Sequence, residues 1–131
     1  MNPALLTAQR AAWVRNHCDA TAEVLEPRES VNERGGTYSV YRRKTYLGRS
    51  QWQARVNTPD KTDSAIAERA DTVLDATISL EWAALSALSK GCLIRIVGGQ
   101  TYEIVSSETD RGQALRLVLE CRRMEGITVI D

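Results

Sequence analysis

The stretch Gly91-Cys92-Leu93-Ile94-Arg95-Ile96-Val97-Gly98-Gly99-Gln100-Thr101-Tyr102-Glu103-Ile104-Val105 contains two short apolar runs separated by a glycine pair. In both runs every second residue points to the same face of an extended chain. These alternating positions are Cys92, Ile94 and Ile96, then Tyr102, Ile104 and Ser106. Adjacent glycines suit a tight reversal because they tolerate left-handed backbone conformations. We therefore predict an antiparallel β-hairpin over these residues.

The same alternation recurs on both sides of this hairpin. Downstream, Asp110-Arg111-Gly112 is a turn sequence. The downstream row is Leu115, Leu117, Leu119 and Cys121. Three rows lie upstream: the first is Ala20, Ala22 and Val24, the second is Trp52, Ala54 and Val56, and the third is Leu74, Ala76, Ile78 and Leu80. Each row predicts one strand with a buried face, and the hairpin together with the downstream row predicts a meander of three successive strands.

Two helical segments accompany the strands. Asn2 can cap and Pro3 can begin a helix over about residues 2–17, since proline in the first turn gives up only an orphan donor. Trp82, Leu85 and Leu88 recur at helical spacing, and Gly91 can close that short helix in a left-handed conformation.

A basic, aliphatic-poor stretch separates the first two long strands. Pro27 is predicted to end the first strand, and Gly35-Gly36 lies amid basic residues. We predict a long mobile loop over about residues 27–49, with a short strand from Tyr38 to Tyr41, because this stretch cannot bury enough surface to order itself. A second polar connection extends to about Arg69.

The expected fold class is mostly β: a small antiparallel β-barrel or sandwich, plugged by the N-terminal helix, with a long mobile loop. The chain has 131 residues, which suits one domain over residues 1–131. It carries 17 basic and 17 acidic residues, so no global field draws it to nucleic acid or to an anionic membrane. Three cysteines without a CxxC pair indicate a reducing compartment. The absence of a signal sequence and of an apolar span predicts a protein that is neither secreted nor membrane-inserted.

No motif in the chain predicts catalysis. His17-Cys18-Asp19 has a catalytic composition, but consecutive residues point in different directions on a helix or a strand. Cys92 and Cys121 fall on predicted core faces, and the four Cys and His residues are too scattered for a zinc site. There is no phosphate-binding glycine motif. We expect no catalytic residue, no cofactor and no metal.

The basic loop is the one candidate contact surface. The candidate residues are Arg28, Arg34, Tyr38, Tyr41, Arg42, Arg43, Lys44, Tyr46 and Arg49. Such a loop can meet phosphates while its rings stack on bases, it can simply be solvated, or it can order only against a partner protein. The connection from Asp60 to Arg69 is a second candidate for partner contacts.

Two further features concern packing and assembly. The β-prone end, residues 127–130, can add an edge strand to its own sheet or to another subunit. Trp13, Trp52 and Trp82 are expected in the core, and any of them left exposed would suit an interface.

The run over residues 91–105, the turn Asp110-Arg111-Gly112 and the strand over residues 115–121 resemble the C-terminal half of head-completion (stopper) proteins of long-tailed bacteriophages. The shared pattern, G-x-x-[IV]-x-[IV]-x-x-G-x-x-Y-x-[IV], describes a β-hairpin. It covers about half of the chain, and Cys92 stands where many relatives have an acidic residue.

The resemblance implies a structural virion protein of the head-to-tail connector. It implies a ring, a hexamer by analogy with the family, that closes the DNA channel after packaging and joins the filled head to the tail. Implied partners are the chain itself, portal and adaptor proteins, tail proteins, and genomic DNA that passes without sequence recognition. The location would be the virion neck, assembled in the host cytoplasm.

Two other functions stay open on the sequence. A small barrel can bind single-stranded nucleic acid through the basic aromatic loop at residues 38–46. A thiol enzyme or sensor would need a cysteine with a low pKa. The ring size, the connector layer and the loop that faces the channel do not follow from the sequence.

Overall fold

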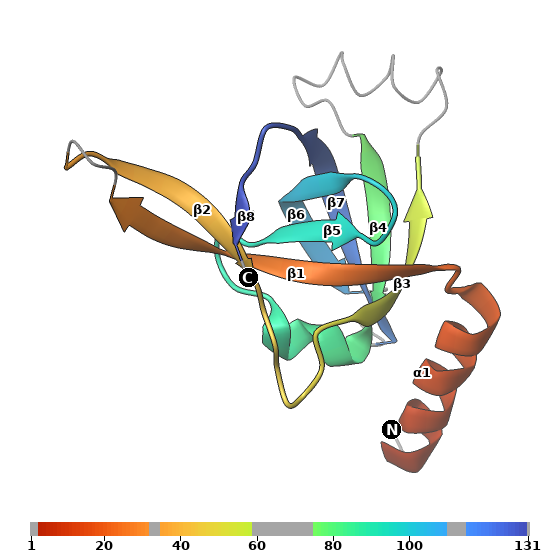
Figure 1. Cartoon of the computed structure of the whole chain (residues 1–131). Coiled ribbons are helices and arrows are strands. Elements are labelled where there is room, and N and C mark those ends of the chain that lie inside the picture. Colours follow the sequence, from red (N-terminus) through yellow and green to blue (C-terminus); the bar gives the residue numbers. More distant parts are fainter. Residues whose placement is uncertain (1–2, 32–34, 59–74, 110–114, 131) are drawn as a thin grey trace.

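The structure, a computed structural model, describes residues 3–31, 35–58, 75–109 and 115–130 (Figure 1). The elements along the chain are α1 (Pro3–His17), β1 (Ala20–Val31), β2 (Thr37–Arg43), β3 (Trp52–Asn57), β4 (Ala76–Glu81), the 3-10 helix η1 (Trp82–Ala87), β5 (Leu93–Ile96), β6 (Thr101–Thr109), β7 (Arg116–Met124) and β8 (Val129–Ile130). The predicted mostly β fold with an N-terminal helix is confirmed.

Six strands close into an antiparallel barrel. They follow the order β3-β4-β7-β6-β5-β1, and β1 then pairs with β3 through Ala20↔Ala54 and Ala22↔Trp52. Closure leaves these strands without free edges over the paired residues, which removes a common route to uncontrolled strand pairing. The prediction of a small antiparallel barrel is therefore confirmed.

The glycine-centred hairpin forms β5 and β6 as expected. Ile94 pairs with Tyr102, and the Gly99 N–H donates to the Ile96 carbonyl at 2.9 Å across the turn. Gly98 has a φ of 76°, in the left-handed region where glycine is favoured. β6 then pairs with β7, which completes the predicted meander, whereas the predicted turn at 110–112 and Leu74 lie outside the described residues.

The barrel interior is filled by predicted inward-facing residues, except that Ser106 is exposed beyond a register shift in β6 between Ile104 and Ser106. Every barrel strand contributes side chains to one buried cluster, which includes Ala22, Val24, Trp52, Ala54, Ala76, Ile78, Leu80, Ile94, Tyr102, Leu117, Leu119 and Cys121. Ile78, Leu80 and Leu119 are fully buried. Because period-two alternation sends these side chains to a common face, the sequence pattern identified the part of the core that the strands supply.

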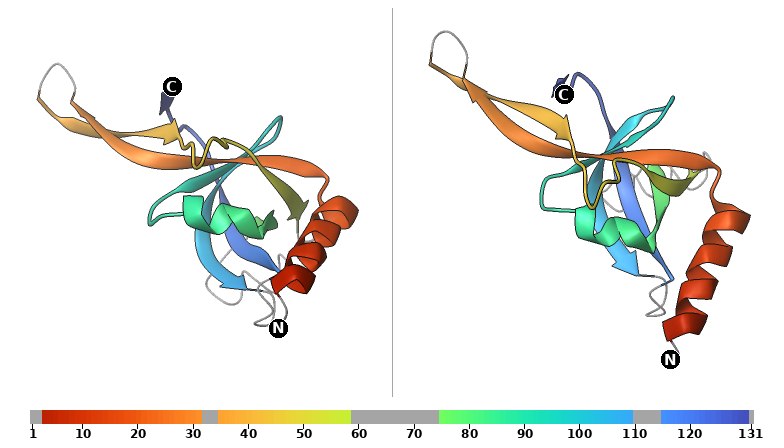
Figure 2. Two further views of the ribbon diagram at one scale, coloured as in Figure 1. Left: turned by 90° about the horizontal axis from the view of Figure 1, so that it is seen from below. Right: turned by 60° about the horizontal axis from the view of Figure 1, so that its bottom comes forward.

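The two helices differ from expectation. α1 does not plug the barrel, because side chains already fill the interior; the helix lies outside the barrel (Figure 2). Trp13 is the one buried side chain of α1. η1 instead packs on the core through Ala84 and Ala87. Of the three residues at helical spacing, Trp82 and Leu88 are partly buried and pack against this core, whereas Leu85 is 46% exposed.

The prediction of a long mobile loop over residues 27–49 is wrong for most of that stretch, whereas the short strand predicted within it from Tyr38 to Tyr41 is confirmed as part of β2. β1 continues to Val31 and pairs with β2 from Leu25↔Arg43 to Val31↔Thr37. The resulting hairpin extends beyond the barrel (Figure 1). We call its outer part, residues 26–31 and 37–42, the arm.

Pro27 does not end β1 because of its place in the ladder. It pairs with Tyr41, whose N–H points the other way and donates to the Thr128 carbonyl at 2.9 Å. In an antiparallel pair of this type neither residue donates to its partner, so a proline loses no hydrogen bond there.

The remaining part of the predicted loop contains a tight turn. Tyr46 and Arg49 exchange backbone hydrogen bonds of 2.8 and 2.9 Å around Leu47 and Gly48. Both central residues have positive φ, 49° for Leu47 and 78° for Gly48. This is the geometry of a two-residue hairpin turn, in which leucine is an unusual choice.

The C-terminal residues join their own sheet. β8 pairs in parallel with β2 through Tyr41↔Val129 and Arg42↔Ile130. Two possibilities were left open for residues 127–130, and the single chain shows the first, an edge strand added to its own sheet. β8 lies at the base of the arm (Figure 1).

Candidate assembly surfaces on the arm and the helix

The arm grows directly from a barrel strand. Along one edge, β1 pairs with β3 up to Ala22 and then with β2 from Leu25 onward, while β5 pairs with its other edge over residues 22–25. At the change of partner, the Lys44 N–H donates to the Val24 carbonyl at 2.8 Å. The barrel and the arm therefore share one continuous strand.

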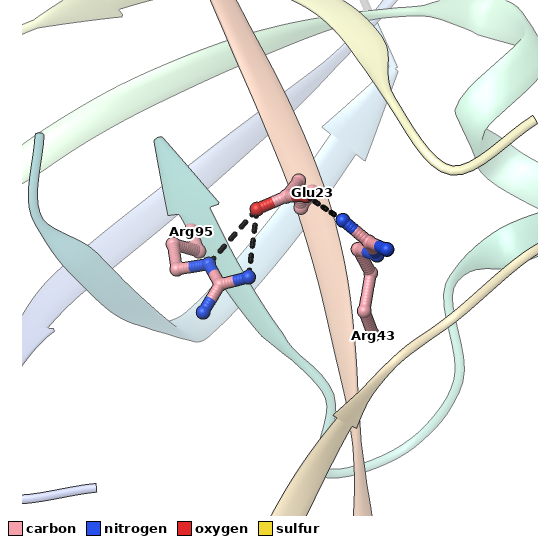
Figure 3. Close-up of polar contacts among 3 residues, drawn as sticks. All are labelled: Glu23, Arg43 and Arg95. Atoms are coloured by element: carbon pink, nitrogen blue, oxygen red, sulfur yellow. Dashed lines mark hydrogen bonds and ion pairs between the residues drawn. The ribbon is translucent and has the colours of Figure 1, made fainter. Parts of the chain in front are cut away.

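A buried carboxylate ties the arm to the barrel wall at this junction (Figure 3). Glu23 of β1 is only 5% exposed. Its Oε2 accepts from Arg43 Nη1 of β2 at 3.1 Å, and its Oε1 accepts from Arg95 Nε of β5 at 2.9 Å. The three residues belong to three different strands, so the cluster holds β2 and β5 against β1.

The arginines also control the charge of Glu23. Burial alone would raise its pKa, but the hydrogen bonds and charges of Arg43 and Arg95 outweigh burial and lower the pKa below the ordinary value of 4.5. The carboxylate is thus ionised at neutral pH, and two cations compensate it.

Three of the nine predicted contact residues are engaged with carboxylates. Besides Arg43, Arg49 Nη1 lies 2.7 Å from Glu81 Oε1, and this pairing raises the pKa of Arg49. Arg28 Nη2 lies 2.9 Å from Glu26 Oε1 in an exposed pair. These guanidinium groups are less available to phosphates than the sequence suggested.

The other predicted residues whose side chains the structure describes have different surroundings. Arg42 is exposed and lies on the opposite face of β2 from Arg43, because neighbouring strand residues alternate. Tyr41 lines a cavity of about 560 Å³ with Leu88 and Leu93, and Tyr46 is 36% exposed beside its turn. Lys44 is half-buried; Tyr38 contributes its backbone to β2. Arg34 and the connection from Asp60 to Arg69 lie outside the described residues.

A second surface, which the sequence did not suggest, lies between α1 and η1. It is a groove of about 520 Å³ lined by Arg10, Ala11, Val14, Arg15, Glu81, Trp82 and Ala83. The Arg10 guanidinium stands 4.8 Å from the centre of the Trp82 ring. Trp82, which is only partly buried, is the one signal that could have found this groove, since an incompletely buried tryptophan suits an interface.

The thiols are poorly suited to nucleophilic chemistry. Burial, followed by the charges of Glu81 and Asp19, raises the pKa of Cys18 to about 11. Burial likewise raises the pKa of Cys92, and that of Cys121 to about 12. A reactive cysteine needs a lowered pKa, so these environments oppose the thiol-sensor alternative.

The described ranges hold neither a metal-ligand cluster nor a membrane span. Within them, no group of three His, Cys, Asp or Glu side chains is placed to hold a metal ion. None of the described helices is both long enough and apolar enough to cross a membrane.

Neither a protein-family model nor a curated protein sequence matches this chain. The features of the chain that bear on its function are the arm, the groove between α1 and η1, and the closed barrel.

Proposed function

We propose that this chain is a structural protein of the head-to-tail connector of a long-tailed bacteriophage, where it forms a ring that closes the DNA channel and joins head to tail. Its partners in this role are further copies of itself, portal or adaptor proteins on one side and tail proteins on the other.

The observation that carries this proposal is the arm. A two-stranded ribbon is marginally stable alone, and this one extends past the barrel with Pro27, Arg28 and Glu29 all exposed. A rigid closed barrel that carries such a projecting ribbon suits a protein that works through contacts with other subunits.

The resemblance to stopper proteins is compatible with the fold. The stretches that carry it, residues 91–105 and 115–121, include the adjacent antiparallel strands β5, β6 and β7 of one barrel wall. The pattern thus describes a contiguous structural unit and not scattered residues.

The test is quantitative peptide mass spectrometry on purified phage particles from the source, with the portal protein as the internal standard. A copy number in a simple ring-like ratio to the portal is the expected result. Absence from particles, with the portal and tail proteins present, would sink the connector proposal.

The nucleic-acid alternative can be tested separately. Replacing Arg42 and Lys44 by alanine removes two cations of the predicted cluster without disturbing Arg43, which holds Glu23. Salt-sensitive binding of single-stranded DNA that is lost in this double variant would favour the alternative. The ion pairs of Arg28, Arg43 and Arg49 weigh against that result.

A further inference from the structure

The groove between α1 and η1 has the composition of a peptide-binding site. Its walls are apolar, formed by Ala11 and Val14 on one side and by Trp82 and Ala83 on the other. Its volume of about 520 Å³ lies within the usual range of roughly 300–1,000 Å³ for binding pockets. An occupant should therefore bring an apolar side chain.

The charge at the rim favours an acidic occupant. Arg15 is exposed, and no ion pair to it is found among the described residues. The one acidic lining residue, Glu81, already accepts from Arg49 at 2.7 Å and from the Gln53 N–H at 2.6 Å. The rim thus leaves a positive charge that a carboxylate can meet.

The arm offers this combination. Pro27 and Glu29 are both exposed and lie two positions apart, so they share one face of β1. Glu26 is already paired with Arg28, which leaves Glu29 as the exposed carboxylate in the described part of the arm. An apolar ring next to a carboxylate matches a groove with apolar walls and an arginine at its rim.

The arm cannot reach the groove of its own chain. α1 and the arm lie at opposite ends of β1 (Figures 1 and 2). Nine residues at about 3.3 Å each separate Ala20 from Glu29, or roughly 30 Å. The Glu23 cluster holds the arm in this direction, because it fixes β2 and β5 to β1.

We infer that the arm of one copy docks in the α1–η1 groove of the next copy, with Pro27 between the apolar walls and Glu29 facing Arg15. Each copy then gives an arm and receives one. Such a head-to-tail contact generates a closed ring when the rotation between copies closes. The inference rests on the proposed function and names the subunit contact that would build the ring.

Charge reversal on the full chain tests the contact. Native mass spectrometry and sedimentation at several concentrations would compare the wild type with Glu29→Lys and Arg15→Glu. We expect the wild type to self-associate and each single variant to associate at least tenfold more weakly, since like charges then face each other.

Mixing the two variants gives the sharper result. A 1:1 mixture offers two favourable contacts. The arm of the Glu29→Lys copy can enter the groove of the Arg15→Glu copy, where the two charges are exchanged. The arm of the Arg15→Glu copy can enter the groove of the Glu29→Lys copy, where the original Glu29–Arg15 pair forms. Association should return, with strictly alternating copies and therefore an even number of subunits. The control Glu125→Lys changes an exposed carboxylate on neither surface and should associate like the wild type.

Failure of the mixture to associate, with both variants folded by circular dichroism, would overturn the arm-to-groove contact. A wild type that stays monomeric at every concentration would overturn it as well. The connector proposal is judged independently by copy number in particles, so a ring-like copy number together with a failed mixture would place the ring contact elsewhere.

Discussion

The barrel and the arm are built from the same strand but are stabilised differently. Within the barrel, Ala22 and Val24 of β1 are at most 1% exposed, whereas Pro27, Arg28 and Glu29 farther along are exposed. The barrel segment is held by burial and by strands on both edges. The part of β1 that lies in the arm is held by its pairing with β2 and by the Glu23 cluster at the base of the arm. β1 therefore stays regular over Pro27, Arg28 and Glu29 although these side chains are exposed.

Loss of a core side chain should give the largest effect. Ile78→Ala removes a fully buried side chain from β4 and should lower the free energy of unfolding by about 2–5 kcal/mol. Urea denaturation measures this value. Arg42→Ala, at an exposed position on the arm, is the matched control and should change it by less than about 0.5 kcal/mol. Equal losses would mean that the arm contributes to the core as much as the barrel does.

The junction between the two regions should be intermediate. Glu23→Gln keeps the shape of the side chain but removes the charge that Arg43 and Arg95 share. We expect a loss of about 1–2 kcal/mol in the free energy of unfolding at pH 7, at the lower end for hydrogen bonds to charged groups because both arginines are partly solvated. A loss below the error of urea denaturation would show that the cluster does not anchor the arm.

The cost of Glu23→Gln should depend on pH. The folded pKa of Glu23 lies below its ordinary value of 4.5, so ionised Glu23 stabilises the fold above pH 4.5. This stabilisation disappears as the pH falls through the folded pKa. The gap between wild type and variant should therefore be constant near neutrality and close below pH 4.5. A gap that widens on acidification would contradict the assignment.

The turn around Leu47 and Gly48 should give a smaller effect of opposite sign. Leu47 has a φ of 49°, which strains its backbone, and its side chain is 87% exposed, so no burial of that side chain offsets the strain. Leu47→Asn should raise the free energy of unfolding by about 0.5–1 kcal/mol, since asparagine tolerates this conformation. The control Leu85→Asn, at a 46% exposed position without positive φ, should not stabilise. A destabilised Leu47→Asn variant would mean that Leu47 makes contacts that the single chain does not show.

The smallest effect is expected on the arm surface. Arg28→Ala removes an exposed ion pair with Glu26 and should change the free energy of unfolding by less than about 0.5 kcal/mol. Arg49→Ala should cost more, because Arg49 binds Glu81 and stacks 5.9 Å from the centre of the Trp52 ring. Thermal unfolding of both variants checks the ranking. A reversed order would indicate that the arm pair is structural.

The barrel could be predicted from the sequence because each of its strands carries a period-two apolar row. The rows led to the right strands, the right hairpin at Gly98-Gly99 and the right core. The arm could not be found in this way, since the run Glu26-Pro27-Arg28-Glu29 breaks the apolar alternation of the first strand. The available signal for a hairpin was the pair Gly35-Gly36 between two extended stretches. A hairpin was not predicted there because Pro27 was expected to end the first strand.

The junction and the groove depend on contacts that a sequence does not display. Glu23 meets Arg43 and Arg95 across 20 and 72 residues of chain, so their meeting follows only from the strand register. The groove lies between α1 and η1, two helices far apart in the sequence, and both contribute to its apolar walls. The junction and the groove both arise from contacts between residues that are far apart in the sequence, and a local sequence pattern does not reveal such contacts.

The continuity of β1 gives the molecule a mechanical property. A pull on the arm along the strand direction reaches the barrel as shear on the ladders that β1 makes with β3 and β5. The hydrogen bonds of antiparallel ladders run perpendicular to the strands, so this load falls on several bonds at once and not on one bond after another. The molecule is thus built to bear tension through its arm, and the Glu23 cluster reinforces the point where the load enters the barrel.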